Sequence, residues 1–344
     1  MAARLAGCLA VVLALLGASI ACGGDAGLPP PTPTLTPAPS PQPDAANDLP
    51  DLLPEPLPGL FAFGEAELQL SHDEYVVGIN PLIAWAALEP REGEYDWDKL
   101  DDAIAAAESA GSTIVPRILT NANFHGQPTP DWFFEIEDAR YYYPSAEAEA
   151  QGFKAPVTWD PVFQAKFGRF LRALGQRYNG DPAIEYFQTN AGGGLYGEIV
   201  VARDYTRFPE GWEPELQREY IVFWLDRWLE AFPDTPLSLM VNHVGDRIGE
   251  DVAAYAARLG VYLQQNTPWL PPEAVDIFLD HQDSTKIILE AEDGCNSTGE
   301  GEFERLMDTV LAYGFAIDYL HLCAQSFIDP VTAARLPSIS LHLR

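Results

Sequence analysis

The pattern of apolar and polar residues between positions 76 and 322 alternates between short apolar runs and longer amphipathic segments. The short runs have the length and residue types of buried strands, and they cover 76–83, 112–119, 184–188, 237–241, 260–263, 286–289 and 315–322. The amphipathic segments have helical spacing, and they cover 96–110, 160–178, 214–231, 248–259, 272–281 and 301–313. The chain is therefore predicted to alternate between strands and helices.

The start of the 160–178 helix is marked by two local signals. Asp160 is a favoured N-cap residue, and Pro161 occupies the first helical position, where its missing N–H is not needed. Apolar residues then recur at helical spacing and form one face, made of Phe163, Phe167, Phe170 and Leu174. This face predicts a helix that packs against a sheet.

Alternating strands and helices favour parallel strands joined by crossover helices. Seven strands are predicted from position 76 onward, and an eighth could come from 60–63 or from 339–343. Eight strands would close a (β/α)₈ TIM barrel, which is the fold we expect for residues 60–344 as a single domain. The alternative is an open doubly wound sheet, but no glycine-rich phosphate loop follows any strand, so a dinucleotide-binding version has little support.

Residues 1–59 are predicted to lie outside the barrel. Arg4 precedes an apolar run at 9–16 that is too short to span a bilayer, which is typical of a signal peptide over 1–21. The following segment resembles a bacterial lipoprotein box, in which Cys22 would be lipidated, although Ser19 departs from the usual pattern. Ordinary cleavage and secretion is the alternative. Residues 22–59 are rich in proline and threonine and favour a flexible, extended tether.

The formal net charge of −31 changes the set of expected partners. A strongly acidic chain repels nucleic acid and anionic lipid, so no nucleic-acid partner is expected. The charge is compatible with a solvated surface on an exported protein and identifies no substrate. Export would also permit a disulfide between Cys295 and Cys323.

Three segments together resemble one family of enzymes. The segment 85–101 reads W-x-x-L-E-P-x-E-G-x-Y-D-W-x-x-L-D, the segment 130–134 reads PDWFF, and 177–190 reads RYNGDPAIEYFQTN. These segments are similar to clan A glycoside hydrolases, and most of all to β-galactosidases of family 42 and related barrel proteins. The resemblance implies a (β/α)₈ barrel with an acid/base glutamate at the end of strand four and a nucleophilic glutamate at the end of strand seven.

Carried onto this chain, the resemblance points to Glu290 as the nucleophile, because it follows the apolar residues of the predicted seventh strand. Glu292 is the second choice. Strand four departs from the family, since Asn190 is followed by Ala191 and not by a glutamate. Glu198 comes after a glycine-rich stretch and could be the acid/base, or it could simply begin the next element.

Polar and aromatic residues near the predicted strand ends are candidates for contact with a sugar. Aromatic rings can stack on the C–H faces of sugars, and a few polar groups fix the orientation of a ligand. The predicted set is Trp85, Asn121, His125, Trp132, Asn190, Tyr196, Asn242 and Glu292. For each aromatic residue, packing in the core is the alternative. The histidines show no metal-binding spacing, and neither a metal nor another cofactor is expected.

The sequence therefore predicts an exported glycoside hydrolase that is held at the outer face of a bacterial membrane through Cys22 and acts on oligo- or polysaccharide. The alternative is a barrel of the same kind that binds carbohydrate without cleaving it. The sugar, the linkage, the stereochemical outcome and the oligomeric state stay open.

Overall fold

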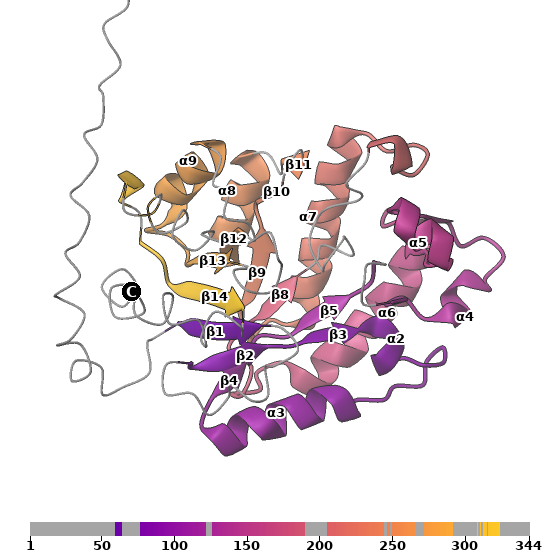
Figure 1. Cartoon of the computed structure of the whole chain (residues 1–344), viewed down its shortest axis with the longest axis horizontal. Coiled ribbons are helices and arrows are strands. Elements are labelled where there is room, and N and C mark those ends of the chain that lie inside the picture. The colour runs from indigo at the N-terminus through magenta and orange to yellow at the C-terminus, as the bar shows by residue number, and fades with distance from the viewer. Residues whose placement is uncertain are drawn as a thin grey trace, which may run out of the picture. The chain divides into compact units, whose positions relative to one another are not determined.

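The computed structural model describes residues 59–63, 76–121, 126–189, 205–243, 246–247, 250–265, 272–291, 308, 310, 312–314 and 316–323 (Figure 1). Parallel strands form its centre, with helices around them. The predicted leader, the predicted tether up to residue 58 and the segment 339–343 lie outside the described residues.

The central sheet contains ten strand segments, and two proline residues explain why there are more segments than expected. Pro81 separates β2 from β3, and Pro116 separates β4 from β5, because proline has no N–H for the ladder. With each of these pairs counted as one strand, ten segments become eight strands. In ring order, the segments are β1 (Leu60–Phe63), β2 (Gly78–Asn80), β3 (Leu82–Ala84), β4 (Thr113–Ile114), β5 (Arg117–Leu119), β8 (Phe187–Thr189), β9 (Leu237–Met240), β12 (Tyr262–Gln265), β13 (Ile287–Ala291) and β14 (Tyr319–Cys323).

The eight strands close into a ring. β1 is paired in parallel with β14 on one side and with β2 on the other. The remaining neighbours, from β3 through β5, β8, β9, β12 and β13 to β14, are also parallel. The prediction of a (β/α)₈ barrel is confirmed, and the open doubly wound sheet is excluded. Residues 60–63 supply the first strand, so β8 is the fourth strand and β13 the seventh, as the sequence predicted.

The long helices agree with their predicted positions. They are α3 (Asp98–Ala110), α6 (Pro161–Tyr178), α7 (Pro214–Ala231), α8 (Glu250–Arg258) and α9 (Pro272–His281). Figure 1 shows α3 on one side of the strands and α7 to α9 on the other. At the start of α6, the Asp160 carboxylate accepts a hydrogen bond from the Val162 N–H, as expected for an N-cap. The predicted helix at 301–313 is only partly within the described residues.

Several short elements were not predicted, and half of them lie between the third strand and α6. They are α4 (Asp131–Phe134), β6 (Tyr141–Tyr142), α5 (Ala146–Gln151) and β7 (Ala155–Pro156), with β6 and β7 paired antiparallel. The others are α2 (Trp85–Leu88), a single 3₁₀ turn at Tyr205–Arg207, β10 (Asn242–His243) and β11 (Asp246–Arg247). Elements of two to six residues are too short to produce a clear hydrophobic period.

The interior has two apolar compartments. The larger one lies between the strands and the surrounding helices, and in α6 it includes the predicted stripe of Phe163, Phe167, Phe170 and Leu174. The smaller one lies inside the ring and consists of Phe61, Val115, Tyr186, Ile288 and Tyr319. Alternate residues of each strand point into the ring, so the polar residues at the next inward positions must lie beside this cluster. These polar residues form the candidate site.

Candidate active site

Among the described residues, several polar side chains are buried inside the barrel near the carboxyl ends of its strands. Five of them belong to five different strands and are Asn80, Arg117, Gln188, Glu290 and His321. On β13, Ile288 and Glu290 are two residues apart, so both side chains point inward. His321 is the register partner of Glu290 on the neighbouring strand β14. In barrels of this type, catalytic groups lie at the carboxyl ends of the strands.

Glu290 forms an ion pair across the interior of the barrel. Its Oε2 atom lies 2.5 Å from Nη2 of Arg117, and the two side chains are 2% and 4% exposed. Burial acts to raise the pKa of Glu290, but the Arg117 charge and the contacts with His321 outweigh it, and the pKa is lowered overall. Glu290 is therefore ionised at neutral pH.

His321 links Glu290 to Tyr186. Its Nδ1 atom lies 3.6 Å from Oε2 of Glu290, and its Nε2 atom lies 2.6 Å from the hydroxyl oxygen of Tyr186. Burial lowers the pKa of His321 even though Glu290 acts in the opposite direction, so the imidazole is neutral. Burial also raises the pKa of Tyr186, so its phenol keeps its proton.

Amide and hydroxyl groups continue this polar layer around the ring. Asn80 Nδ2 donates to the carbonyl of Val115 at 2.6 Å and approaches Oε1 of Gln188 at 3.4 Å. Ser238 Oγ donates to Oε1 of Gln264 at 2.8 Å. Hydrogen bonds of this kind compensate the burial of polar groups, so the layer holds its side chains in fixed positions.

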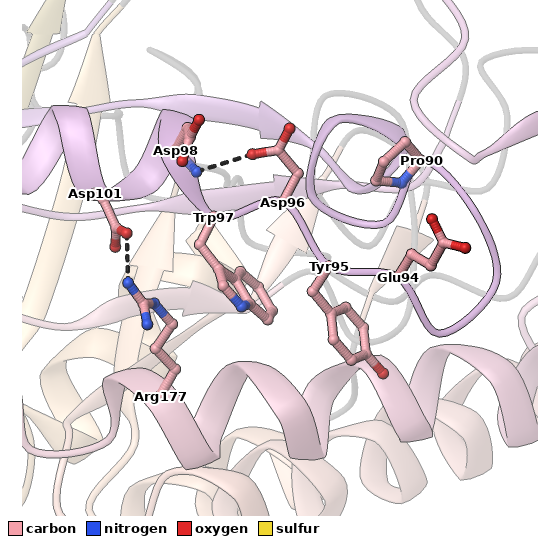
Figure 2. A pocket seen from close by; sticks show the side chains of 8 residues that line it. All are labelled: Pro90, Glu94, Tyr95, Asp96, Trp97, Asp98, Asp101 and Arg177. Carbon is pink, nitrogen blue, oxygen red and sulfur yellow. Dashed lines mark hydrogen bonds and ion pairs between the residues drawn. The ribbon is translucent and has the colours of Figure 1, made fainter.

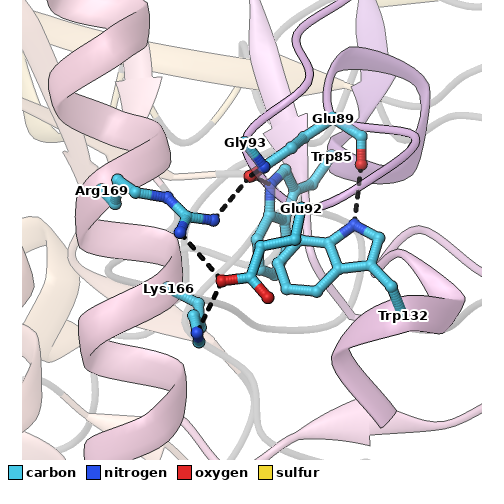
Figure 3. Close-up of polar contacts among 7 residues, drawn as sticks. All are labelled: Trp85, Glu89, Glu92, Gly93, Trp132, Lys166 and Arg169. Atoms are coloured by element: carbon cyan, nitrogen blue, oxygen red, sulfur yellow. Dashed lines mark hydrogen bonds and ion pairs between the residues drawn. The ribbon is translucent and has the colours of Figure 1, made fainter. Parts of the chain in front are cut away.

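The motif that carries the family resemblance has an architectural role (Figure 3). The Glu89 carboxylate accepts hydrogen bonds from Trp85 Nε1 at 2.8 Å, from the Gly93 N–H at 2.7 Å and from Arg169 Nη2 at 2.9 Å. Trp132 Nε1 donates to the Glu89 carbonyl at 2.9 Å. Glu89 thus fastens the turn after the second strand to α4 and α6.

The predicted role of Trp85 in sugar binding does not agree with its position. Its side chain is fully buried, and its ring lies within 5.2 to 6.1 Å of the rings of Phe163, Phe167 and Phe170. Trp85 packs outward against α6 and belongs to the aromatic core. Trp132 is partly buried and packs edge-on against Trp85 at 5.6 Å.

Asn121 lies just after the third strand, as predicted, but its amide is already engaged. Its Nδ2 atom donates to the hydroxyl of Tyr142 at 3.0 Å, and the residue is buried. The contact joins the end of the third strand to β6, so this end of Asn121 holds the loop in place.

Several predicted residues cannot be placed. The residues that lie outside the described part of the chain are Cys22, His125, Asn190, Tyr196, Glu198, Glu292 and Cys295. Asn242 in β10 and Cys323 in β14 are described for the backbone alone. The pairing of Glu198 with Glu290, the disulfide between Cys295 and Cys323, and the lipidation of Cys22 remain predictions.

Arg117, Tyr186 and His321 were not predicted as site residues. A signal is present in the sequence, because Arg117 and His321 are single polar residues within apolar strands, in the segments TIVPRIL and YLHLC. Period two places each of them on the same face as a residue of the inner cluster, namely Val115 and Tyr319.

A surface pocket of about 420 Å³ lies outside the barrel, beside the start of α3 and the end of α6 (Figure 2). Tyr95 and Trp97 stack there with ring centroids 5.1 Å apart, and Asp101 pairs with Arg177. Trp97 also contacts Phe170 at 6.1 Å, so these rings dock the turn onto α6. The pocket is separate from the layer that contains Glu290.

Two further findings concern metals and membranes. Within the described residues, no group of three or more His, Cys, Asp and Glu side chains is placed to hold a metal ion. Among the helices that the structure describes, none combines the length and the apolar character needed to cross a bilayer.

Comparison with known families bears on the first half of the barrel. Residues 72–206 match the family model of glycoside hydrolase family 42, which is described as β-galactosidase. The chain resembles clan A glycoside hydrolases. The matched segment contains the Glu89 turn and the first strands after β1, whereas Glu290 and His321 lie beyond it. The match supports glycoside hydrolase activity in general. No curated protein matches the chain.

Solved structures support the barrel fold. The catalytic domain of β-amylase from Paenibacillus polymyxa superposes with a TM-score of 0.58 at 10% identity, covering 84% of this chain and 98% of that one. The β-galactosidase of Halorubrum lacusprofundi has a TM-score of 0.48 at 16% identity, covering 78% of this chain and 52% of that one. The exo-β-1,4-mannosidase Op5Man5 from Opitutaceae bacterium strain TAV5 has a TM-score of 0.48 at 12% identity, covering 82% and 55%. At these identities the likeness concerns the fold, and the β-amylase domain carries it.

Proposed function

We propose that this protein is a glycoside hydrolase that cleaves O-glycosidic bonds in oligo- or polysaccharide. Glu290 would be the nucleophile and Glu198 the acid/base. The observation that supports this proposal best is the position of Glu290, an ionised glutamate near the carboxyl end of the seventh strand of a closed parallel barrel.

The proposed reaction has two steps. Glu290 attacks the anomeric carbon, while Glu198 gives its proton to the leaving glycosidic oxygen. Water then breaks the new ester bond to Glu290 and gives its proton to Glu198, so both carboxyl groups return to their starting states. Arg117 favours the ionised form of Glu290 that the attack needs, because it places a positive charge 2.5 Å from the carboxylate.

A paired substitution tests the role of Glu290. Turnover is measured on a panel of aryl glycosides, beginning with an aryl β-galactoside because of the description of the matched family. We expect Glu290→Gln to lower kcat by at least about 10³-fold. Glu185→Gln is the matched control, since Glu185 precedes the fourth strand and binds Tyr319 at 2.5 Å, away from the polar layer. The control should keep its turnover.

Covalent labelling gives a second test that does not depend on a variant. A 2-deoxy-2-fluoro glycoside of an active sugar should form a stable ester on the nucleophile, and mass spectrometry of the digested protein identifies the labelled peptide. A label on Glu290 supports the assignment. A label on another residue, or full turnover by a folded Glu290→Gln variant, would remove Glu290 from the mechanism.

Carbohydrate binding without cleavage is the second candidate. It is favoured by two observations, the replacement of the family glutamate after Asn190 by Ala191 and the nearly complete burial of Glu290 in its ion pair. Calorimetry with oligosaccharides would detect binding, and a reducing-sugar assay over long incubation would detect cleavage. Binding with no released sugar supports this candidate, and released sugar rejects it.

We further propose that the barrel is exported and held at the outer face of a bacterial membrane by a lipid on Cys22. The support is the apolar run at 9–16 followed by small residues and Cys22, with a proline-rich segment after it. Mass spectrometry of the mature N-terminus tests the proposal. A terminus that begins at Cys22 and carries acyl chains is expected, and an unmodified terminus would contradict the anchor.

A further inference from the structure

His321 lies between Glu290 and Tyr186 in the barrel interior, and its side chain has no exposed surface. Its two ring nitrogens face different partners, with Nδ1 3.6 Å from Glu290 Oε2 and Nε2 2.6 Å from the Tyr186 hydroxyl. The Tyr186 and His321 rings stack with centroids 6.1 Å apart, and Phe61 packs on His321 at 5.5 Å. The imidazole therefore has a fixed position and orientation.

We propose that His321, held in one tautomer by Tyr186, is a positioning residue that orients the Glu290 carboxylate for attack. This inference rests on the proposed function, since it assigns Glu290 the role of nucleophile. It adds His321 and Tyr186 to the residues that act on Glu290.

The tautomer follows from the two partners. A neutral imidazole carries one N–H and one lone pair. A lone pair at Nδ1 would face the negative Glu290 oxygen, so the proton resides on Nδ1 and points toward the carboxylate. Nε2 then accepts a hydrogen bond from the Tyr186 hydroxyl, which keeps its proton because burial raises its pKa.

The orientation of the carboxylate follows from the atom that is contacted. Arg117 approaches Oε2 of Glu290 from the third strand, and His321 approaches the same oxygen from the eighth. Arg117 holds Oε2 directly, and His321 Nδ1 faces the same oxygen from 3.6 Å, beyond hydrogen-bond distance. Together they favour one rotation of the carboxylate, with Oε1 directed to the substrate. When water releases the sugar, the negative charge returns to a carboxylate whose donors are already in place.

A second hydrogen-bonded network lies near the amino ends of the strands and provides a control for the Tyr186 variant. Tyr319 precedes His321 by two residues on β14, and its hydroxyl donates to Glu185 Oε1 at 2.5 Å and lies 2.5 Å from Lys286 Nζ. Removal of the Tyr319 hydroxyl takes away a part-buried tyrosine hydrogen bond from β14, the strand that carries His321. Tyr319→Phe is therefore the matched control for Tyr186→Phe.

The experiment measures kcat/KM against pH for the wild type, four single variants and one double variant, together with thermal unfolding of each. His321→Phe removes both ring nitrogens and should lower kcat/KM by about 10-fold, because the N–H dipole of Nδ1 no longer faces the carboxylate. It should also shift the acidic limb of the profile upward by about one pH unit, because Glu290 loses this favourable polar contact. His321→Asn keeps an N–H close to the position of Nδ1 and should recover most of both effects.

The Tyr186 variant tests the relay itself. Tyr186→Phe should lower kcat/KM by about 3- to 10-fold in the wild-type background and have little effect when His321 is already Asn, because the two residues act as one unit. Tyr319→Phe should leave kcat/KM and the acidic limb unchanged. Nitrogen-15 shifts of the His321 ring provide a readout besides turnover, and they should report a proton on Nδ1.

The outcomes separate the inference from the proposed function. An active wild type whose acidic limb is the same in His321→Phe overturns the positioning role and leaves the hydrolase proposal standing. A proton found on Nε2 of His321 has the same consequence. A folded wild type that neither turns over nor is labelled by any glycoside overturns both proposals.

Discussion

Arg117 and Glu290 meet inside the barrel, with Nη2 and Oε2 2.5 Å apart and both side chains almost fully buried. They come from the third and the seventh strand, which are not neighbours in the ring. The ion pair therefore crosses the interior, so the charge that the proposed chemistry requires is also part of what holds opposite walls of the barrel together.

Loss of Arg117 should destabilise the barrel strongly. Arg117→Met leaves the Glu290 carboxylate buried with its main counter-charge gone, and such changes cost about 3–5 kcal/mol. Arg117→Met combined with Glu290→Met removes both charges and should recover much of the loss. Urea unfolding monitored by circular dichroism gives the free energy of each variant. A double variant no more stable than Arg117→Met would contradict the explanation by uncompensated charge.

His321 and Glu290 should make the stability of the protein depend on pH in two separate ranges. The pKa of His321 is lowered from 6.5 by burial, so the unfolded chain binds a proton that the folded chain does not, and stability is lost as the pH falls below about 6.5. The pKa of Glu290 is lowered from 4.5 because Arg117 outweighs burial, so its contribution is present above about pH 4.5 and is lost below that value.

The variants assign these windows to their residues. His321→Phe should flatten the melting temperature against pH just below pH 6.5, and Glu290→Gln should flatten it below pH 4.5. Tyr186, which faces His321, keeps its proton across this range because burial raises its pKa. Scanning calorimetry in steps of half a pH unit is the measurement. Curves parallel to that of the wild type would refute the assignment.

The Glu89 turn should depend on one buried carboxylate. Glu89→Gln removes the charge of a fully buried carboxylate and weakens its part-buried contacts to Gly93 and Arg169, which costs about 1–3 kcal/mol. Glu92 is the matched control, since it pairs with Lys166 and Arg169 at the surface and its substitution by Gln should cost less than about 1 kcal/mol. Thermal unfolding of both variants tests this, and equal losses would contradict it.

Two glycines of α6 should respond in opposite directions. A Cβ atom at Gly175 would lie 2.1 Å from the carbonyl oxygen of Ala231, whereas at Gly168 the nearest atom is 3.9 Å away, on Arg172. Gly175→Ala should therefore force α6 and α7 apart and destabilise the protein by about 1–3 kcal/mol. Gly168→Ala should stabilise it by about 0.5–1 kcal/mol through higher helix propensity. Equal melting temperatures for the two variants would show that the helices are not in close contact.

Elements with local sequence signals were predicted well. Contacts between side chains on strands that face each other across the ring were not predicted. Asp160 with Pro161 fixed the start of α6 because capping involves neighbouring residues. Glu290 was predicted because it follows an apolar strand, and the structure places its side chain in the buried polar layer. Arg117 and His321 were missed because their partner is chosen by which strands face each other across the ring. Trp85 was predicted to bind sugar because the local sequence does not reveal that its side chain packs outward onto α6.

The ring is closed by the pairing of β1 with β14, which are the first and last strands that the structure describes. A nascent chain cannot satisfy either of these edges until residue 323 has emerged, since every earlier intermediate is an open sheet. An interrupted translation product would thus present two unpaired parallel edges, the kind of surface on which chains associate with one another. Folding of this barrel is therefore expected to be a late event, completed after nearly the whole polypeptide has been made.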